Sequence, residues 1–240
     1  MPGWRGNIGV IACSMENISE RQYYRVLPDG VVAHFVRISR LKPAEVSLEE
    51  MIMGDRLKQC AQLVADAKPD LIVFADHSWS FERGVGWDRQ VAKRIEDETG
   101  IPSITMSTSI LEALKSLKIS KVAAVGPWND AKVSKLKEFH SGHGIEIVNY
   151  RFVPPDTLLC APDEAYYQIL RQTDVDTAQG LLACFSGERS LDVVEALEKD
   201  LQKPVVGAVQ ATIWYALQKM QVREPLLGHG LLFRTPLLRE

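Results

Sequence analysis

Short apolar runs rich in β-branched residues alternate along the chain with longer stretches in which apolar residues recur at helical spacing. The short runs are typical of buried parallel strands, and the longer stretches are typical of amphipathic helices. Strands are predicted at residues 8–12, 32–38, 71–75, 103–106, 121–125, 146–150, 180–184 and 204–208. Helices are predicted at residues 48–67, 87–99, 109–117, 131–143, 162–175, 190–201 and 211–219. The chain is therefore predicted to be an α/β protein with mostly parallel sheets.

A weak internal repeat divides this pattern into two halves. The segment DLIVFADHS and the elements that follow it, up to ILEAL, can be laid over GLLACFSGE and the elements up to TIWYAL. The repeat favours two α/β lobes over one larger sheet, although any two strand–helix–strand units resemble each other to some degree. The first lobe is predicted to comprise residues 1–116 with about 212–240, and the second residues 117–211. Asp76 and Cys184 then end equivalent strands and face one cleft, where open α/β sheets bind ligands.

Composition and charge exclude several classes of protein. No apolar run approaches the ~18 residues that span a bilayer, and the start MPGWRGNIGVIACS does not have the features of a signal peptide. We therefore expect a cytoplasmic protein with no membrane partner. Lys and Arg number 28 against 31 Asp and Glu, with no block of like charge, which argues against a nucleic-acid partner. Association into a homo-oligomer is left open.

The cysteines and motifs predict no cofactor. The four cysteines form no CxxC pair, so neither a disulfide framework nor a structural zinc site is indicated. The sequence has no GxxxxGK[ST] loop, no GxGxxG after a strand and no HExxH, and its histidines do not have metal-ligand spacing. We expect no metal and no nucleotide cofactor.

Cys184 closes the apolar strand GLLAC just before a new helix. A thiol at such a place can meet backbone N–H groups and the positive end of a helix dipole, which favour thiolate chemistry. The alternative is a small buried side chain without a chemical role. Cys13 follows the first predicted strand and can line the same cleft.

Asp76 ends the matching strand of the first half, and His77 and Ser78 follow it. A carboxylate among apolar neighbours can act as an acid or a base. The alternative is an acid and an imidazole that simply face water on a loop.

The stretch TMSTS places Ser107 and Thr108 at the start of a helix. Hydroxyls and N–H groups at a helix start can hold a carboxylate or an enediolate oxygen. We also expect Thr108 or Ser109 to cap the helix. Trp128, in the loop after VAAV, either walls the cleft or fills an edge of the core.

With these residues in hand, the chain resembles the aspartate/glutamate racemase superfamily, in the branch of arylmalonate decarboxylase and maleate cis-trans isomerase. The resemblance covers nearly the whole chain. It rests on the order and spacing of YYRVLPDGVVAHFVRI, SWSFERG, GIPSITMSTSILEALKSLKISKVAAVGPW, LLACFSG, KPVVGAVQATIWYAL and GHGLLF. It implies two pseudo-symmetric, flavodoxin-like (Rossmann-like) lobes with the active site in the cleft between them.

The resemblance also implies roles for residues. Racemases and isomerases of the superfamily use one cysteine from each lobe, whereas the decarboxylases keep only the second-lobe cysteine, which protonates an enediolate. Cys184 matches that proton donor, and Asp76 falls on the position of the lost cysteine. His77 and Ser78 match oxyanion-hole contacts, with His77 in place of a threonine, and Trp128 replaces a substrate-binding tyrosine. The expected substrate-binding residues are Ser14, Asn17, His77, Ser78, Ser107, Thr108, Trp128, Phe185 and Ser186.

Three functions follow from these residues, each with a small carboxylate as ligand. The first is a cofactor-free decarboxylase of a substituted malonate or related carboxylate, in which Cys184 protonates the enediolate. The second is a racemase or cis-trans isomerase of a small (di)carboxylic acid that uses Asp76 and Cys184. The third is a catalytically inactive binding protein. An ionised Asp76 would repel a malonate dianion by a few kcal/mol at an effective dielectric constant of ~20.

Overall fold

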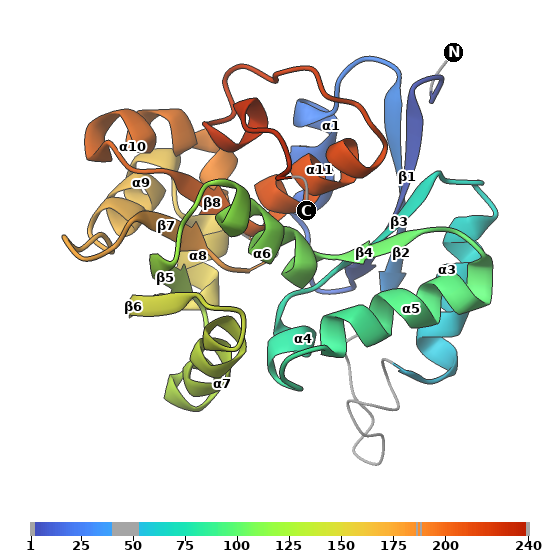
Figure 1. Cartoon of the computed structure of the whole chain (residues 1–240), viewed down its shortest axis with the longest axis horizontal. Helices are drawn as coiled ribbons and strands as arrows, with labels where there is room; N and C mark the ends of the chain where they lie inside the picture. The colour runs from blue at the N-terminus through green and yellow to red at the C-terminus, as the bar shows by residue number, and fades with distance from the viewer. Residues whose placement is uncertain (1–2, 40–52, 186, 188, 239–240) are drawn as a thin grey trace.

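The fold is built on two parallel sheets (Figure 1). The computed structural model describes residues 3–39, 53–185, 187 and 189–238. The first sheet has the order β2-β1-β3-β4, with β1 at Gly6–Cys13, β2 at Val31–Ile38, β3 at Leu71–Ala75 and β4 at Ser103–Thr105. The second has the order β6-β5-β7-β8, with β5 at Lys121–Gly126, β6 at Glu146–Phe152, β7 at Gly180–Ala183 and β8 at Val205–Gly207. Every strand predicted from the sequence is present, and the α/β prediction is confirmed.

Helices cover both faces of the sheets, as parallel sheets require. They are α1 at Ser19–Val26, α3 at Asp55–Ala65, α4 at Ser78–Phe81, α5 at Trp87–Thr99, α6 at Met106–Ser116, α7 at Asp130–Ser141, α8 at Pro155–Cys160, α9 at Asp163–Arg171, α10 at Val194–Leu201 and α11 at Ala208–Lys219. Short 3₁₀ helices occur at Ser190–Asp192 and Leu232–Arg234. The sequence pattern did not predict α1, α4 or α8, because each is too short to show a clear helical period. Part of the predicted helix 48–67 lies outside the described residues.

The start of α6 differs from the expectation. The helix begins at Met106, and its cap is Thr105, whose hydroxyl accepts the backbone N–H of Thr108 at 3.1 Å. The prediction that Thr108 or Ser109 caps this helix is therefore wrong. The Ser109 hydroxyl instead donates to the carbonyl of Thr105 at 2.8 Å. Several neighbouring hydroxyls compete for the cap in TMSTS, and the strand ends early enough for the first of them to take it.

The two sheets repeat one register as well as one strand order. In the first sheet, Ala12 of β1 pairs with Ala75 of β3. In the second, Val125 of β5 pairs with Ala183 of β7. The internal repeat read from the sequence is therefore a real duplication of strand order and register.

Helices α6 and α11 lie between the two sheets and pack against each other (Figure 1). Both contact β3 of the first sheet and β8 of the second. One apolar core accordingly extends through both lobes. The boundaries predicted near residues 116 and 212 stay a prediction. None of the described helices is long and apolar enough to cross a membrane.

Candidate active site

A cleft opens at the carboxyl ends of strands from both lobes. The first lobe contributes Cys13, Met15, Glu16, Asp76, His77 and Ser78 to its lining, and the second contributes Pro127, Trp128, Pro155, Phe185 and Gly187. This is the edge at which parallel sheets bind ligands. The volume is about 220 Å³, below the ~300 Å³ at which pockets for drug-sized molecules begin. The cleft therefore suits a small molecule.

Superposing the registers of the two sheets pairs the residues at their strand ends. Asp76, directly after β3, is equivalent to Cys184, directly after β7. Cys13, the last residue of β1, is equivalent to Gly126, the last residue of β5. Each lobe thus presents one thiol, but on non-equivalent strands.

Asp76 is buried and holds the start of α4. Its Oδ1 accepts the Ser78 hydroxyl at 2.9 Å and the Trp79 backbone N–H at 3.0 Å. These are bonds of the kind that an ionised carboxylate accepts at a helix start. Because the Ser78 hydroxyl donates to Asp76, it stabilises the start of α4, and Ser78 also lines the cleft.

His77 is buried where the two lobes meet. Its Nδ1 lies 2.8 Å from the Ser107 hydroxyl, and its ring contacts Phe81 of the first lobe and Trp128 and His140 of the second. Burial, with a contribution from His140, holds the pKa of His77 well below its ordinary value. His77 is therefore a neutral imidazole at pH 7, and it joins the lobes while one side of it borders the cleft.

The TMSTS segment does not reach the cleft as expected. Ser107 is fully buried behind His77. Thr108 lies on another side of α6, where its hydroxyl donates to Asp88 at 2.7 Å. Because α6 begins at Met106, these residues lie in its first turn and point in different directions. The structure therefore does not bring Ser107 and Thr108 together as a seat for an enediolate.

Cys184 is fully buried at the end of β7. Its Sγ lies 3.1 Å from the carbonyl oxygen of Val125, to which the thiol donates. Cys184 is not among the described lining residues of the cleft, whereas its neighbour Phe185 and Gly187 are, and Ser186 lies outside the described residues. The S–H bond is thus held beside the cleft, one residue behind its wall.

Tyr150 of β6 was not predicted as a site residue. Its hydroxyl accepts the backbone N–H of Trp128 at 3.0 Å. Burial, and then the nearby Cys184, raise the pKa of Tyr150, so the side chain remains a phenol. A hydroxyl is therefore present behind Trp128 although the tyrosine expected at position 128 is replaced. Only the strand pattern of residues 146–150 could have indicated it.

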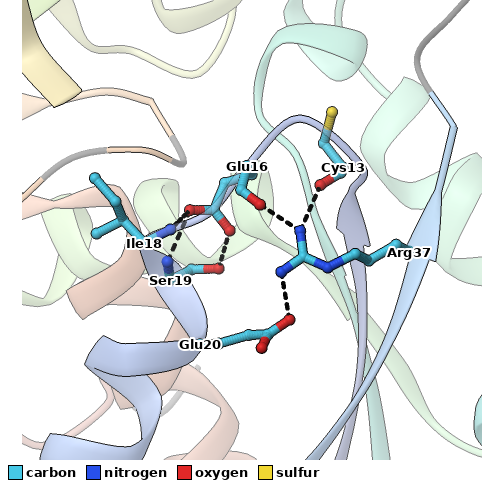
Figure 2. A network of polar contacts seen from close by, with 6 residues as sticks. All are labelled: Cys13, Glu16, Ile18, Ser19, Glu20 and Arg37. Carbon is cyan, nitrogen blue, oxygen red and sulfur yellow. Dashed lines mark hydrogen bonds and ion pairs between the residues drawn. The ribbon is translucent and has the colours of Figure 1, made fainter.

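The loop after β1 is held by Glu16, which lines the cleft (Figure 2). Its carboxylate accepts the backbone N–H of Ser19 at 2.7 Å, the N–H of Ile18 and the Ser19 hydroxyl. Glu16 thereby accepts N–H groups at the start of α1, whose N-cap residue is Ile18. Ser14 and Asn17 are exposed and do not contribute to the described lining, because the loop turns their side chains outward.

Arg37 of β2 fixes the same loop from below (Figure 2). Its guanidinium donates to the carbonyls of Cys13 and Glu16, and it pairs with Glu20. These bonds fix the backbone on which the Cys13 side chain stands.

The cleft has an acidic rather than a basic lining. Glu16 and Asp76 are its acidic residues, and none of the described lining residues is Lys or Arg. Within the part of the chain that the structure describes, no group of His, Cys, Asp and Glu could hold a metal ion. The expectation of no cofactor stays a prediction.

Comparison with known families supports the resemblance read from the sequence. Residues 44–233 match the family model of arylmalonate decarboxylase. The chain belongs to the arylmalonate decarboxylase family. Membership makes the protein an enzyme, a decarboxylase or an isomerase of the same superfamily, as the resemblance implied.

Relatives of both kinds are similar to this member of the family. A maleate isomerase of Pseudomonas putida is 28% identical over 208 residues, which cover 81% of this chain and 82% of that protein. An arylmalonate decarboxylase of Bordetella bronchiseptica is 26% identical over 151 residues, which cover 59% and 61%. The alignments do not separate the two activities.

Solved structures show the same fold. A maleate isomerase from Pseudomonas putida, with maleate, matches with a TM-score of 0.87 at 20% identity, covering 98% of this chain and 99% of that one. An arylmalonate decarboxylase matches with a TM-score of 0.79 at 21% identity, covering 95% and 99%. The two-lobed fold class predicted from the sequence is confirmed.

Proposed function

We propose that this protein is a cofactor-independent decarboxylase of a substituted malonate or a related small carboxylic acid. One observation carries the proposal: of two equivalent strand ends, β7 presents the thiol of Cys184 and β3 presents the carboxylate of Asp76. A carboxylate is a far poorer nucleophile than a thiol toward an activated alkene. The arrangement suits a reaction in which the second-lobe thiol alone completes the chemistry.

The reaction needs one proton, and Cys184 can supply it. The bond between the α-carbon and one carboxylate breaks, CO₂ leaves, and the electron pair forms an enediolate with the group that stays. The Cys184 S–H then protonates the α-carbon, and the thiolate regains a proton from water. A thiol that donates to the Val125 carbonyl holds that proton in the resting enzyme. For this step the Cys184 side chain has to turn from the Val125 carbonyl toward the cleft.

The lining of the cleft favours loss of a carboxylate. Apolar walls are formed by Pro127, Trp128 and Phe185. A charged carboxylate is poorly solvated beside such walls, whereas neutral CO₂ needs little solvation, so the walls favour the loss of CO₂. Glu16 and Asp76 add negative charge, which disfavours a dianion by a few kcal/mol at an effective dielectric constant of ~20. We therefore expect a malonate monoester, which has a single carboxylate, to bind better than the corresponding diacid.

Racemisation or cis-trans isomerisation is the second candidate. Asp76 lines the cleft from the strand end equivalent to that of Cys184, so the two groups can act on opposite faces of an α-carbon. A maleate cis-trans isomerase of Nocardia farcinica with a covalently bound succinylcysteine intermediate matches this chain at 22% identity with a TM-score of 0.85. The bonds that Asp76 makes to Ser78 and Trp79 count against this role.

Turnover of defined acids tests the proposal. The purified protein is incubated with phenylmalonate, 2-methyl-2-phenylmalonate, its monoethyl ester and maleate, and CO₂ release and products are followed by NMR. The Cys184→Ala variant is compared with Cys60→Ala, which removes a buried thiol of α3 away from the cleft. Both variants are checked for folding by circular dichroism.

The outcomes separate the candidate functions. CO₂ release that is lost in Cys184→Ala and kept in Cys60→Ala supports the decarboxylase. Conversion of maleate to fumarate without CO₂ release supports the isomerase instead. Binding of these acids by folded protein with no conversion overturns both and indicates an inactive binding protein.

A further inference from the structure

We propose that Cys13, and not Asp76, is the first-lobe acid/base of this cleft, so that the enzyme also exchanges and inverts the α-proton of small carboxylic acids. The inference rests on the proposed function, because it uses the same enediolate and the same second-lobe donor, Cys184. It adds a second activity and a catalytic residue on β1 that the β3 strand end does not supply.

The sheet register places Cys13 beside Asp76. Ala12 and Ala75 are partners on the neighbouring strands β1 and β3, so the next residue of each chain segment leaves the sheet at the same edge. Neighbouring strands lie ~4.8 Å apart. Cys13 and Asp76 are each 4% exposed, and both line the cleft. The thiol is therefore one strand away from the position equivalent to Cys184.

The backbone around Cys13 is fixed in a way that leaves its side chain to the cleft. Arg37 donates to the Cys13 and Glu16 carbonyls. Figure 2 shows the Cys13 sulfur directed away from Arg37 and from the rest of this network. The guanidinium therefore orients the residue without covering the thiol, and general acid/base groups require such positioning.

A thiol suits proton removal from carbon better than Asp76 does. In general a thiolate is a stronger base than a carboxylate, and the α-proton of a carboxylic acid is very weakly acidic, so a thiolate is the better partner for this proton. Asp76 is also engaged as the acceptor for Ser78 and Trp79 at the start of α4. Asp76 therefore stabilises the start of α4 and borders the cleft.

The two thiols come from opposite lobes and so can act on opposite faces of one substrate. Cys13 ends β1 of the first sheet, and Cys184 follows β7 of the second. Cys13 first loses its thiol proton to water, and the resulting thiolate removes the α-proton, leaving an enediolate and a thiol. The Cys184 thiol then donates its own proton to the other face and becomes a thiolate. Each sulfur exchanges its proton with water, so the α-carbon is inverted and, in D₂O, acquires deuterium.

The test measures exchange and decarboxylation separately. (R)- and (S)-2-phenylpropionate are incubated in D₂O with the wild type, Cys13→Ala, Cys13→Ser, Asp76→Asn, Cys184→Ala and the control Cys60→Ala. Loss of the α-proton is followed by NMR and inversion by chiral chromatography. CO₂ release from 2-methyl-2-phenylmalonate and the thermal unfolding midpoint are measured on the same preparations.

We expect Cys13→Ala to lower exchange relative to CO₂ release by at least about 100-fold, the usual size of a general acid/base contribution. Cys184→Ala should abolish both reactions. Exchange that persists in Cys13→Ala, or that is lost in Asp76→Asn but not in Cys13→Ala, overturns the inference. Wild-type enzyme that releases CO₂ without any exchange overturns it while the proposed function stands. Cys13-dependent exchange without CO₂ release supports it while the proposed function fails, and protein inert in both assays overturns both.

A measurement on the unmodified protein covers the case in which the Cys13 variants do not fold. Iodoacetamide labelling, mapped by mass spectrometry, should modify Cys13 at a rate that saturating 2-phenylpropionate lowers at least tenfold. Cys160, which is exposed and is not among the described lining residues of the cleft, is the control and should be labelled at the same rate with and without the acid. Equal labelling of Cys13 with and without the acid overturns the inference.

Discussion

The carboxyl ends of the two sheets share a backbone arrangement but differ in chemistry. In the first lobe, five of the six described lining residues are polar or ionisable: Cys13, Glu16, Asp76, His77 and Ser78. In the second lobe, the described lining residues are proline, glycine and aromatic residues, with Cys184 directly behind them. The duplicated backbone therefore sets the positions from which side chains can contact a ligand, and the residue type at each position sets the chemistry.

One cause of this difference is steric. A side chain at Gly126, the equivalent of Cys13, would place its Cβ 3.0 Å from the Tyr150 hydroxyl and 3.1 Å from the Trp128 ring. The second lobe uses that space for a tyrosine and a tryptophan. Its thiol therefore has to come from β7, whereas the first lobe has room for a thiol on β1.

Removal of the Cys184 thiol should produce the largest effect, because among the described residues on the second-lobe side of the cleft it removes the proton donor. We expect Cys184→Ala to lower kcat/KM by at least about 100-fold, or ~2.7 kcal/mol in the activation barrier. The measurement is steady-state turnover of the best substrate at pH 7. Cys60→Ala is the matched control and should stay within about threefold of the wild type. If Cys184→Ala kept more than a tenth of the wild-type activity, the Cys184 thiol would not be the chemical difference between the lobes on which turnover depends.

The histidine pair at the junction of the lobes should make stability depend on pH. Burial is the main cause that lowers the pKa of His140 to about 4, and burial holds the pKa of His77 well below its ordinary value. In the unfolded chain both titrate near ~6.5, so between pH 6.5 and 4 the unfolded state binds protons that the folded state does not. The free energy of unfolding should therefore fall as the pH falls, by up to ~1.4 kcal/mol per pH unit for each histidine.

Urea denaturation at pH 7.5 and pH 5 measures this dependence. The His140→Phe variant keeps an aromatic ring beside Phe139 and should have a smaller loss of stability in acid than the wild type. An identical loss in the variant would show that the junction does not respond to pH through this residue.

The sequence could predict the sheets because their signal is local. Apolar strands such as Leu71–Ala75 and Gly180–Ala183 are buried on both faces, so nearly every residue in them is apolar. The equivalence of the two halves followed from the repeat, and with it the placement of Asp76 and Cys184 at matching strand ends. His77, Ser78, Trp128 and Phe185 line the cleft, and the substrate-binding roles that the family resemblance implies for them stay a prediction.

The remaining site residues depend on contacts that a single sequence does not show. Ser107 faces His77 because α6 starts three residues earlier than its apolar period indicated. Glu16 rather than Ser14 or Asn17 lines the cleft, because the loop is held by the bonds of its carboxylate to the start of α1, a helix too short to predict. The Tyr150 hydroxyl on β6 accepts the backbone N–H of Trp128, which lies in the loop after the neighbouring strand β5.

Loss of the Ser107 hydroxyl should lower the stability of the protein, because Ser107 contacts His77 at the junction of the two lobes. In Ser107→Ala the buried Nδ1 of His77 loses its hydrogen-bond partner, which we expect to cost about 2 kcal/mol. Thermal unfolding should show a midpoint lower by about 4–8 °C. Ser134→Ala, at an exposed hydroxyl of α7, is the control and should change stability by less than about 0.5 kcal/mol. Equal midpoints for the two variants would indicate that His77 does not need this contact.

The smallest effect should come from making the second lobe more like the first at Gly126. In Gly126→Ala the added methyl group presses on the Tyr150 hydroxyl and the Trp128 ring, at an expected cost of about 1 kcal/mol. Tyr150→Phe removes the oxygen that lies 3.0 Å from the added methyl group, so the double variant should lose about 0.5 kcal/mol less than the sum of the single variants. Urea denaturation of the four proteins measures this coupling. Strict additivity would mean that the contact with the Trp128 ring alone causes the loss of stability in Gly126→Ala. Glycine would then be needed at this position because of the tryptophan in the wall of the cleft and not because of Tyr150 behind it.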